Sequence, residues 1–92
     1  MPYIKSADRV RIEYCAEEIS AITALSDAIQ TEGDLNYVIT RLCHSFLKKK
    51  GEKYATYNTL IGVLECAKQE FYRRKVSPYE DKKIQENSDL EE

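Results

Sequence analysis

The sequence predicts an all-α protein, a helical bundle with a three-helix core and a short fourth helix. In three segments, apolar residues recur every three or four positions, which is the period of an amphipathic helix. Residues typical of helix starts and stops separate these segments. The predicted core helices cover about residues 7–30, 35–50 and 57–75, and the C-terminal helix covers about residues 78–86.

The first predicted helix begins after Ser6, a suitable N-cap, with Asp8 in the first turn, where the helix dipole favours a carboxylate. Its apolar stripe consists of Ile12, Cys15, Ile19, Ile22, Leu25 and Ile29. Gly33 is expected to end this helix in a left-handed conformation. Asp34 is then expected to cap the second helix.

The second predicted helix has an apolar stripe of Leu35, Val38, Ile39, Leu42 and Phe46. Lys48, Lys49 and Lys50 follow at its C-terminal end, where the dipole favours cations, and Gly51 supplies the stop. This position accounts for the lysine run without nucleic acid.

A different face of the second helix carries a polar row made of Tyr37, Arg41, His44 and Lys48. Such a row could grip an anion, with the tyrosine ring stacking on the ligand. The alternative is an ordinary polar face in water. His44 is the only histidine, so a histidine-based metal centre within one chain is excluded.

The third predicted helix begins at a Thr56 cap. Its apolar stripe is Tyr57, Leu60, Ile61, Leu64, Ala67, the stem of Lys68, and Phe71. Gly62 and Cys66 form a small-residue patch on another side, where a neighbouring helix or a ligand could come close.

The fourth predicted helix begins at Ser77-Pro78-Tyr79-Glu80, which has the form of a capping box with proline at the first helical position. Because proline biases the residue before it away from helical dihedrals, the third helix is expected to end near Lys75 or Val76.

At 92 residues the chain can form one domain at most, and helical chains of this size often complete their core by self-association. We therefore expect a single helical domain over residues 1–88, a disordered acidic tail at residues 89–92, and a homo-oligomer, a dimer or higher. Cys15, Cys43 and Cys66 lie far apart in apolar patterns, which indicates buried, reduced thiols in a cytoplasmic protein. The sequence predicts neither a signal peptide nor a membrane span.

Charge is unevenly distributed. Residues 1–34 hold seven acids and three bases, residues 35–83 hold five acids and eleven bases, and residues 84–92 hold four acids and no base. The overall net charge of −2 argues against a duplex-DNA-binding protein. The basic middle is compatible with a small anionic ligand or an acidic patch on a partner. The alternative is that these charges lie on solvated helix faces.

The junction between the third and fourth helices is the strongest candidate site. Arginines there could meet phosphate-type oxygens in bidentate geometry, a tyrosine could stack on a ring, and the helix start offers free N–H groups. The alternative is local helix pairing, as between Glu70 and Arg74. Together with the polar row, the candidate ligand-binding residues are Tyr37, Arg41, Tyr72, Arg73, Arg74, Tyr79, Lys82 and Lys83.

Enzymatic function has less support, and the sequence assigns no catalytic residue, cofactor or metal site. All-α nucleotide pyrophosphohydrolases collect Mg²⁺ with acids three residues apart, a spacing that the three long predicted helices lack. A divalent-metal nucleotide hydrolase would have to use Glu65, Glu70, Glu80 or Asp81.

Three stretches, GDLNYVITRL (33–42), ECAKQEFYRR (65–74) and PYEDKKIQEN (78–87), resemble a family of small uncharacterised proteins encoded by phages and prokaryotes. The resemblance covers about residues 31–88 and carries no established activity. It implies a cytoplasmic protein of a phage or its bacterial host. Small phage proteins of this kind sometimes block host defence, by binding a defence protein or sequestering a nucleotide signal.

Three functions therefore stay open. The first is a non-enzymatic, homo-oligomeric protein that binds an anionic, nucleotide-like ligand at the candidate residues. The second is a protein–protein interaction module that inhibits a host defence protein, with tyrosines and arginines as interface anchors. The third is the metal-dependent hydrolase.

Overall fold

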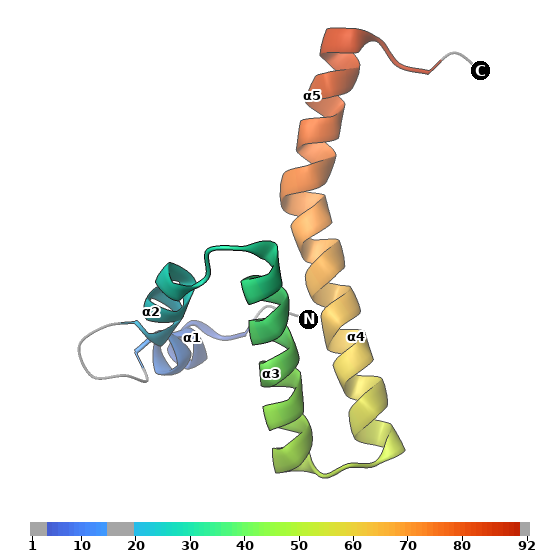
Figure 1. The fold of residues 1–92 in the computed structure, drawn as a ribbon. Helices are drawn as coiled ribbons and strands as arrows, with labels where there is room; N and C mark the ends of the chain where they lie inside the picture. Colours follow the sequence, from blue (N-terminus) through green and yellow to red (C-terminus); the bar gives the residue numbers. More distant parts are fainter. Residues whose placement is uncertain (1–3, 15–19, 91–92) are drawn as a thin grey trace. The chain divides into compact units, whose positions relative to one another are not determined.

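The computed structural model describes residues 4–14 and 20–90. Its helices are α1 (Ser6–Glu13), α2 (Ala21–Ala28), α3 (Glu32–Lys50), α4 (Tyr54–Phe71), the π-helical turn η1 (Tyr72–Val76), and α5 (Ser77–Asn87) (Figure 1). The described residues contain no strand, which confirms the all-α class. The chain divides into two compact units, residues 3–60 and residues 61–92, and each is described by itself.

The single helix predicted over residues 7–30 is wrong, because α1 ends at Glu13 and α2 begins at Ala21. Ser20 has a non-helical ψ of 124°, and its side-chain oxygen accepts a hydrogen bond from the Thr23 N–H at 3.3 Å. Its hydroxyl also donates to the Glu13 carboxylate at 2.7 Å, and α1 contacts α2. Serine bonds readily to nearby backbone and so favours a helix start over a helix interior. Cys15 and Ile19, which belong to the predicted stripe, lie outside the described residues.

Helix α3 starts earlier than predicted, with Thr31 as its N-cap and Gly33 inside its first turn. The Thr31 side chain accepts from the Asp34 N–H at 3.0 Å, while the Asp34 carboxylate accepts from the N–H groups of Gln30 at 3.0 Å and Thr31 at 3.2 Å. This reciprocal pattern is a capping box, so Asp34 occupies its third position and not the cap itself. Hydrogen bonds from Gln30 and Thr31 hold the pKa of Asp34 below its ordinary value.

The C-terminal end of α3 follows the prediction: three lysines occupy its last turn and Gly51 ends it with a φ of 98°. That left-handed conformation is one that glycine adopts without steric cost. The predicted Thr56 cap is wrong, because α4 begins two residues earlier, at Tyr54. The Lys53 carbonyl accepts the N–H groups of Thr56 at 3.0 Å and Tyr57 at 3.1 Å, so Lys53 occupies the N-cap position.

The break predicted at Ser77-Pro78 is also wrong: α4, η1 and α5 continue as one helix (Figure 1). Ser77 has helical dihedrals (φ −61°, ψ −47°) and is therefore part of the helix. Val76 occupies the N-cap position of α5 and makes no side-chain cap bond. Proline inside a helix removes one N–H donor, and its ring clashes with the carbonyl four residues back. The wider π turn accommodates that ring, since the Ser77 N–H donates to the Tyr72 carbonyl five residues back.

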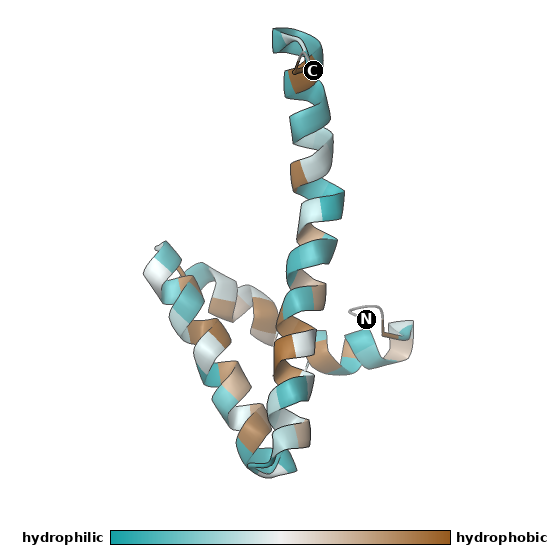
Figure 2. Cartoon of the chain, turned by 90° about the vertical axis from the view of Figure 1, so that its right-hand side faces the viewer, coloured by the Kyte–Doolittle hydropathy of each residue, from teal (hydrophilic) through white to brown (hydrophobic). Residues whose placement is uncertain are grey.

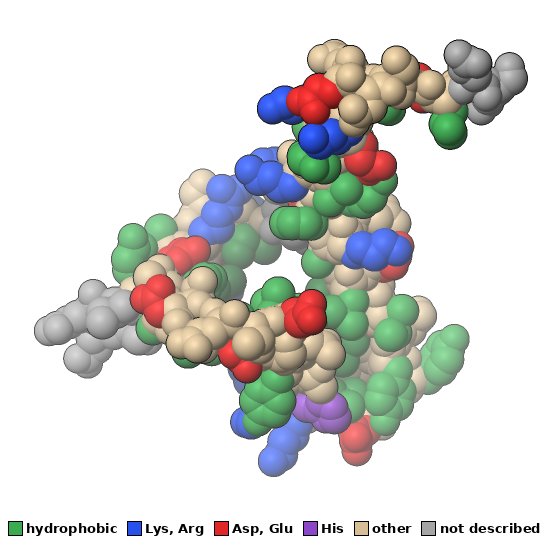
Figure 3. Space-filling model, turned by 45° about the horizontal axis from the view of Figure 1, so that its top comes forward, with side chains coloured by type: hydrophobic (Ala, Val, Ile, Leu, Met, Phe, Trp, Pro, Cys, Tyr) green, Lys and Arg blue, Asp and Glu red, His purple; other side chains and the backbone are tan. Residues whose placement is uncertain are grey.

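Apolar side chains are exposed throughout the described part of the chain. Thr56 is the only buried residue there, and no apolar residue is buried. Figure 2 shows apolar stretches (brown) along the helices, and Figure 3 shows apolar side chains (green) at the surface of the face in view. The described members of the stripes that the sequence assigns to a core are therefore present on the helices, and each is exposed or only partly buried. Completion of the bundle by self-association stays a prediction.

Helix α5 ends at Asn87, and Ser88 follows with a φ of 70°. Disorder of the tail at residues 89–92 and a single domain over residues 1–88 stay predictions. Among the described helices, none has the length and apolar character needed to cross a membrane.

Candidate functional site

The two arginines of the predicted C-terminal site share one carboxylate. Arg73 donates to both Glu70 oxygens, at 3.0 Å and 3.2 Å, and Arg74 also donates to Glu70. The Glu70 side chain is only 20% exposed, whereas those of Arg73 and Arg74 are 65% and 58% exposed. Helical spacings of three and four residues produce these pairs. The arginines therefore stabilise the helix beside the π turn.

Tyr72 and Glu80 form a second local pair, which spans Pro78. The Tyr72 hydroxyl donates to the Glu80 carboxylate, and this hydrogen bond, together with the negative charge of Glu80, raises the pKa of Tyr72. Tyr72 is thus held as a neutral phenol that points along the helix toward α5.

The remaining predicted residues of this region lie on α5. The Lys83 ammonium bonds to Glu86 at 3.1 Å and lies 5.6 Å from the centre of the Tyr79 ring. Lys82 has no ion pair or hydrogen bond with the described residues. The structure therefore ties Tyr72, Tyr79 and Lys83 into local pairs along one helix.

An open hollow of about 570 Å³ runs beside the π turn. Its lining residues are Glu65, Lys68, Gln69, Tyr72, Arg73 and Ser77. Glu65 accepts from Gln69 at 3.1 Å and pairs with Lys68 at 3.3 Å, and these contacts lower its pKa. One acid and two bases line this hollow, and both bases form ion pairs with neighbouring acids, Lys68 with Glu65 and Arg73 with Glu70. These pairs reduce the attraction of the hollow for an anion.

The polar row on α3 is present, and its members separate into two groups. The Arg41 guanidinium donates to the Tyr37 hydroxyl at 2.9 Å and lies 5.8 Å from the centre of that ring. His44 and Lys48 line a hollow of about 510 Å³ together with Leu47 and Glu52. Lys48 and Glu52 therefore bring one charge of each sign to this hollow.

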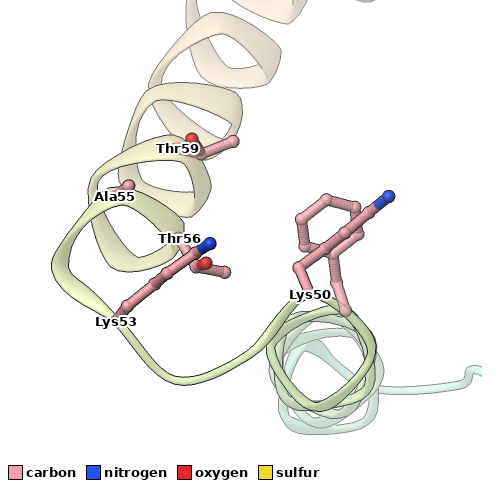
Figure 4. Close-up of a pocket in the computed structure, with 6 residues that line it drawn as sticks. Lys50, Lys53, Ala55, Thr56 and Thr59 are labelled. Carbon is pink, nitrogen blue, oxygen red and sulfur yellow. The ribbon is translucent and has the colours of Figure 1, made fainter.

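A third hollow, of about 280 Å³, lies at the turn between α3 and α4 (Figure 4). It is lined by Phe46, Lys50, Lys53, Ala55, Thr56 and Thr59. Lys50 lies 5.8 Å from the centre of the Phe46 ring, and no acid is among the lining residues. This cationic hollow is absent from the sequence predictions. The sequence does contain a signal for it, because Lys53, Thr56 and Thr59 are spaced three residues apart. The prediction of Thr56 as a helix cap assigned that threonine a different role.

The carboxylates, the histidine and the thiols of the described residues lie spread along the helices. No group of three His, Cys, Asp or Glu side chains there is arranged to hold a metal ion. Glu65, Glu70 and Glu80 instead bond to neighbouring lysine, arginine and tyrosine side chains. Cys43 and Cys66 are free thiols, and the exposure of Cys66 corrects the expectation that it is buried.

The described residues define a small all-helical protein whose candidate surfaces lie along helix faces and at one helix–helix turn. The chain belongs to the DUF6899 family: the model described as "Domain of unknown function (DUF6899)" matches residues 1–90. This agrees with the resemblance to an uncharacterised family, while a phage or prokaryotic origin stays a prediction. No curated protein and no solved structure matches the chain.

Proposed function

We propose that this protein is a non-enzymatic, helical protein–protein interaction module that associates first with a second copy of itself. The observation that carries the proposal is the uncovered apolar stripe of the long helix. Side-chain exposure along it is 47% for Tyr57, 67% for Ile61, 38% for Leu64 and 64% for Phe71.

A single helix cannot cover its own stripe. At about 100° per residue, Ile61, Leu64 and Phe71 fall within one sector of roughly 80°, and Tyr57 lies in the same sector. Each such side chain contributes roughly 1.5–3 kcal/mol when it is fully buried. When two stripes associate, several of these side chains become buried, and each adds its contribution to the free energy of association. The aromatic residues among them are typical anchors of protein interfaces.

Self-complementarity favours a second copy as the occupant. Two copies present the same apolar surface, so a symmetric pair covers both stripes at once. The charges beside the stripe are already paired along the helix, Glu65 with Lys68 and Glu70 with Arg73 and Arg74. They therefore add little repulsion between two copies.

The other sequence-derived hypotheses stay proposals of lower rank. A host defence protein in place of the second copy would use the same stripe. A nucleotide-like ligand at Arg73 and Arg74 would compete with Glu70, which both side chains already contact. The phage-type, cytoplasmic setting is likewise proposed from the resemblance alone.

The oligomeric state tests the proposal. Light scattering coupled to size exclusion should give a multiple of the 10.7 kDa chain mass. Ile61→Lys should yield the monomer, because a charge in the stripe cannot be buried without a partner. Cys66→Lys is the matched control: it adds the same charge about 140° away around the helix and should leave the mass unchanged.

Two results would overturn the proposal. One is a monomeric wild-type chain at high micromolar concentration, which would leave the stripe to a different protein. The other is dissociation of both lysine variants to the same extent, which would show that added charge anywhere on the helix acts nonspecifically.

A further inference from the structure

The turn between α3 and α4 combines several hydrogen-bond donors and cations around one hollow. Lys50 and Phe46 reach it from the end of α3, while Lys53, Ala55, Thr56 and Thr59 reach it from the start of α4. In Figure 4 the side chains of Lys53, Thr56 and Thr59 lie on the side of α4 that faces Lys50. All six residues belong to the unit of residues 3–60.

Within the part of the chain that the structure describes, no side-chain oxygen caps the start of α4. Lys53 occupies the N-cap position, and a lysine side chain has donors but no acceptor. The first N–H groups of α4, at Tyr54 and Ala55, precede the first backbone hydrogen bonds of the helix. By contrast, Thr31 caps α3 and Ser20 caps α2 with side-chain oxygens. An acceptor for the first turn of α4 must come from outside these side chains.

Thr56 supplies an independent observation. Its residue is 5% exposed, yet among the described residues no hydrogen bond engages its hydroxyl. The described residues contain no fully enclosed side-chain polar atom without a partner. The Thr56 hydroxyl is therefore not fully enclosed, and its side chain lines the hollow. A buried hydroxyl with an unused donor and an open path to a cationic hollow indicates a ligand with acceptor atoms.

The electrostatics of the hollow select an anion. Two ammonium groups line it, and Glu52, the nearest acid in the chain, lines the separate hollow beside His44. The ring of Phe46 holds the Lys50 ammonium by a cation–π contact, which limits the number of positions that this side chain samples. Ammonium groups, hydroxyls and helix N-terminal amides together are the donors that proteins use for phosphate.

We propose that the α3–α4 turn binds a phosphate group in the hollow lined by the Lys50 and Lys53 ammonium groups, the Thr56 and Thr59 hydroxyls, and Ala55, whose N–H group is among the first of α4. The site takes the tetrahedral oxyanion itself, as inorganic phosphate or as the terminal group of a phosphate monoester. It lies apart from the apolar stripe around Ile61, so it does not depend on self-association.

The test is a titration of the full chain with inorganic phosphate, followed by ¹⁵N–¹H NMR at constant ionic strength. The amides of Tyr54 and Ala55 should shift together along one saturable curve, and sodium chloride at the same ionic strength should not move them. Parallel titrations with a sugar phosphate and a nucleoside monophosphate identify the kind of phosphate compound that binds. If one of them has a lower dissociation constant than inorganic phosphate, groups beyond the phosphate contribute to binding.

Variants separate this site from general attraction to lysines. Thr56→Val removes only the hydroxyl and should weaken phosphate binding by about tenfold or more, the expected loss for a hydrogen bond to a charged group. Thr56→Ser, which restores the hydroxyl, should recover most of that affinity. Lys53→Ala should also weaken binding, while Lys49→Ala removes one charge of the same lysine run without touching the hollow and should change affinity less than about threefold.

Three outcomes would overturn the proposal: no saturable shift of the two amides, equal effects of Lys49→Ala and Lys53→Ala, or unchanged affinity in Thr56→Val. The Ile61→Lys variant keeps this test distinct from that of the proposed function. It should bind phosphate as the wild type does, whatever its oligomeric state.

Discussion

Replacing Pro78 by alanine should convert the π turn into ordinary α-helix and break the Tyr72–Glu80 hydrogen bond. In a regular α-helix, residues eight apart are separated by about 80° around the axis. The π turn absorbs one residue, so Tyr72 and Glu80 lie as if seven apart, at about 20°. Loss of the π turn would rotate Glu80 away from the Tyr72 hydroxyl by about 100°.

The stability change follows from the missing donor. Alanine at position 78 restores an N–H group for the Arg74 carbonyl and removes the proline ring from the helix interior. A regained hydrogen bond is worth about 1 kcal/mol, and the full penalty of an interior proline is about 3 kcal/mol. The opening free energy of the surrounding turns should therefore rise by about 1–3 kcal/mol, which corresponds to about 5- to 150-fold slower amide exchange.

Two measurements on Pro78→Ala check this reasoning. Amide hydrogen exchange over residues 72–82 reports the local stability, and a pH titration of the Tyr72 Cζ signal reports the Glu80 contact. Tyr72 should lose the elevation of its pKa. Ser77→Ala is the control, because the Ser77 N–H and not its side chain makes the π hydrogen bond. Unchanged exchange together with a still elevated Tyr72 pKa would show that proline does not cause the π turn.

Three further predictions concern caps and protonation. Glu80→Gln should lower the pKa of Tyr72 in the same NMR titration, whereas Glu86→Gln, which removes a carboxylate bonded to Lys83, should not. Because that pKa is raised on folding, its contribution to stability is complete below the unfolded value of about 10 and is lost as pH rises through the folded value. Thr31→Ala should destabilise the start of α3 by about 1 kcal/mol in urea unfolding, with Thr31→Ser close to wild type. The pKa of Asp34 is lowered, so its contribution is present above the unfolded value of 3.8 and is lost as pH falls through the folded value; Asp34→Asn should flatten this acid-side loss in thermal melts.

The sequence predicts helix type and periodicity well, and it predicts helix ends less well. The stop at Gly51 is predictable because a left-handed φ favours glycine and three lysines suit the preceding turn. The helix start at Ser20 is not predictable from periodicity, because the apolar spacing continues across it and carries no information about a local capping bond. At Ser77-Pro78 the opposite happened, since a strong local start signal was overridden by a helix that runs on through a π turn.

The candidate site shows a similar division. The sequence locates Arg73, Arg74, Tyr72 and Tyr79 near one another, and the structure does keep them on one continuous helix. Sequence proximity could not reveal that Glu70 would contact both arginines, since each pair depends on side-chain rotamers. Nor could it reveal the hollow at the α3–α4 turn, because that hollow depends on where α4 begins.

Helical spacing explains why the α3–α4 turn differs from the rest of the basic region. Several cations within the helices pair with an acid three or four residues away, as Lys68, Arg73, Arg74 and Lys83 do. Lys50 and Lys53 flank a non-helical turn, and the positions three and four residues from each hold no acid. Their charges are therefore not neutralised by local helix pairing, and both side chains line the hollow at the turn. If charge density alone selected the ligand, the cluster at Arg73 would be the stronger site; because capture by neighbouring acids decides which charges stay available, we expect phosphate at the turn.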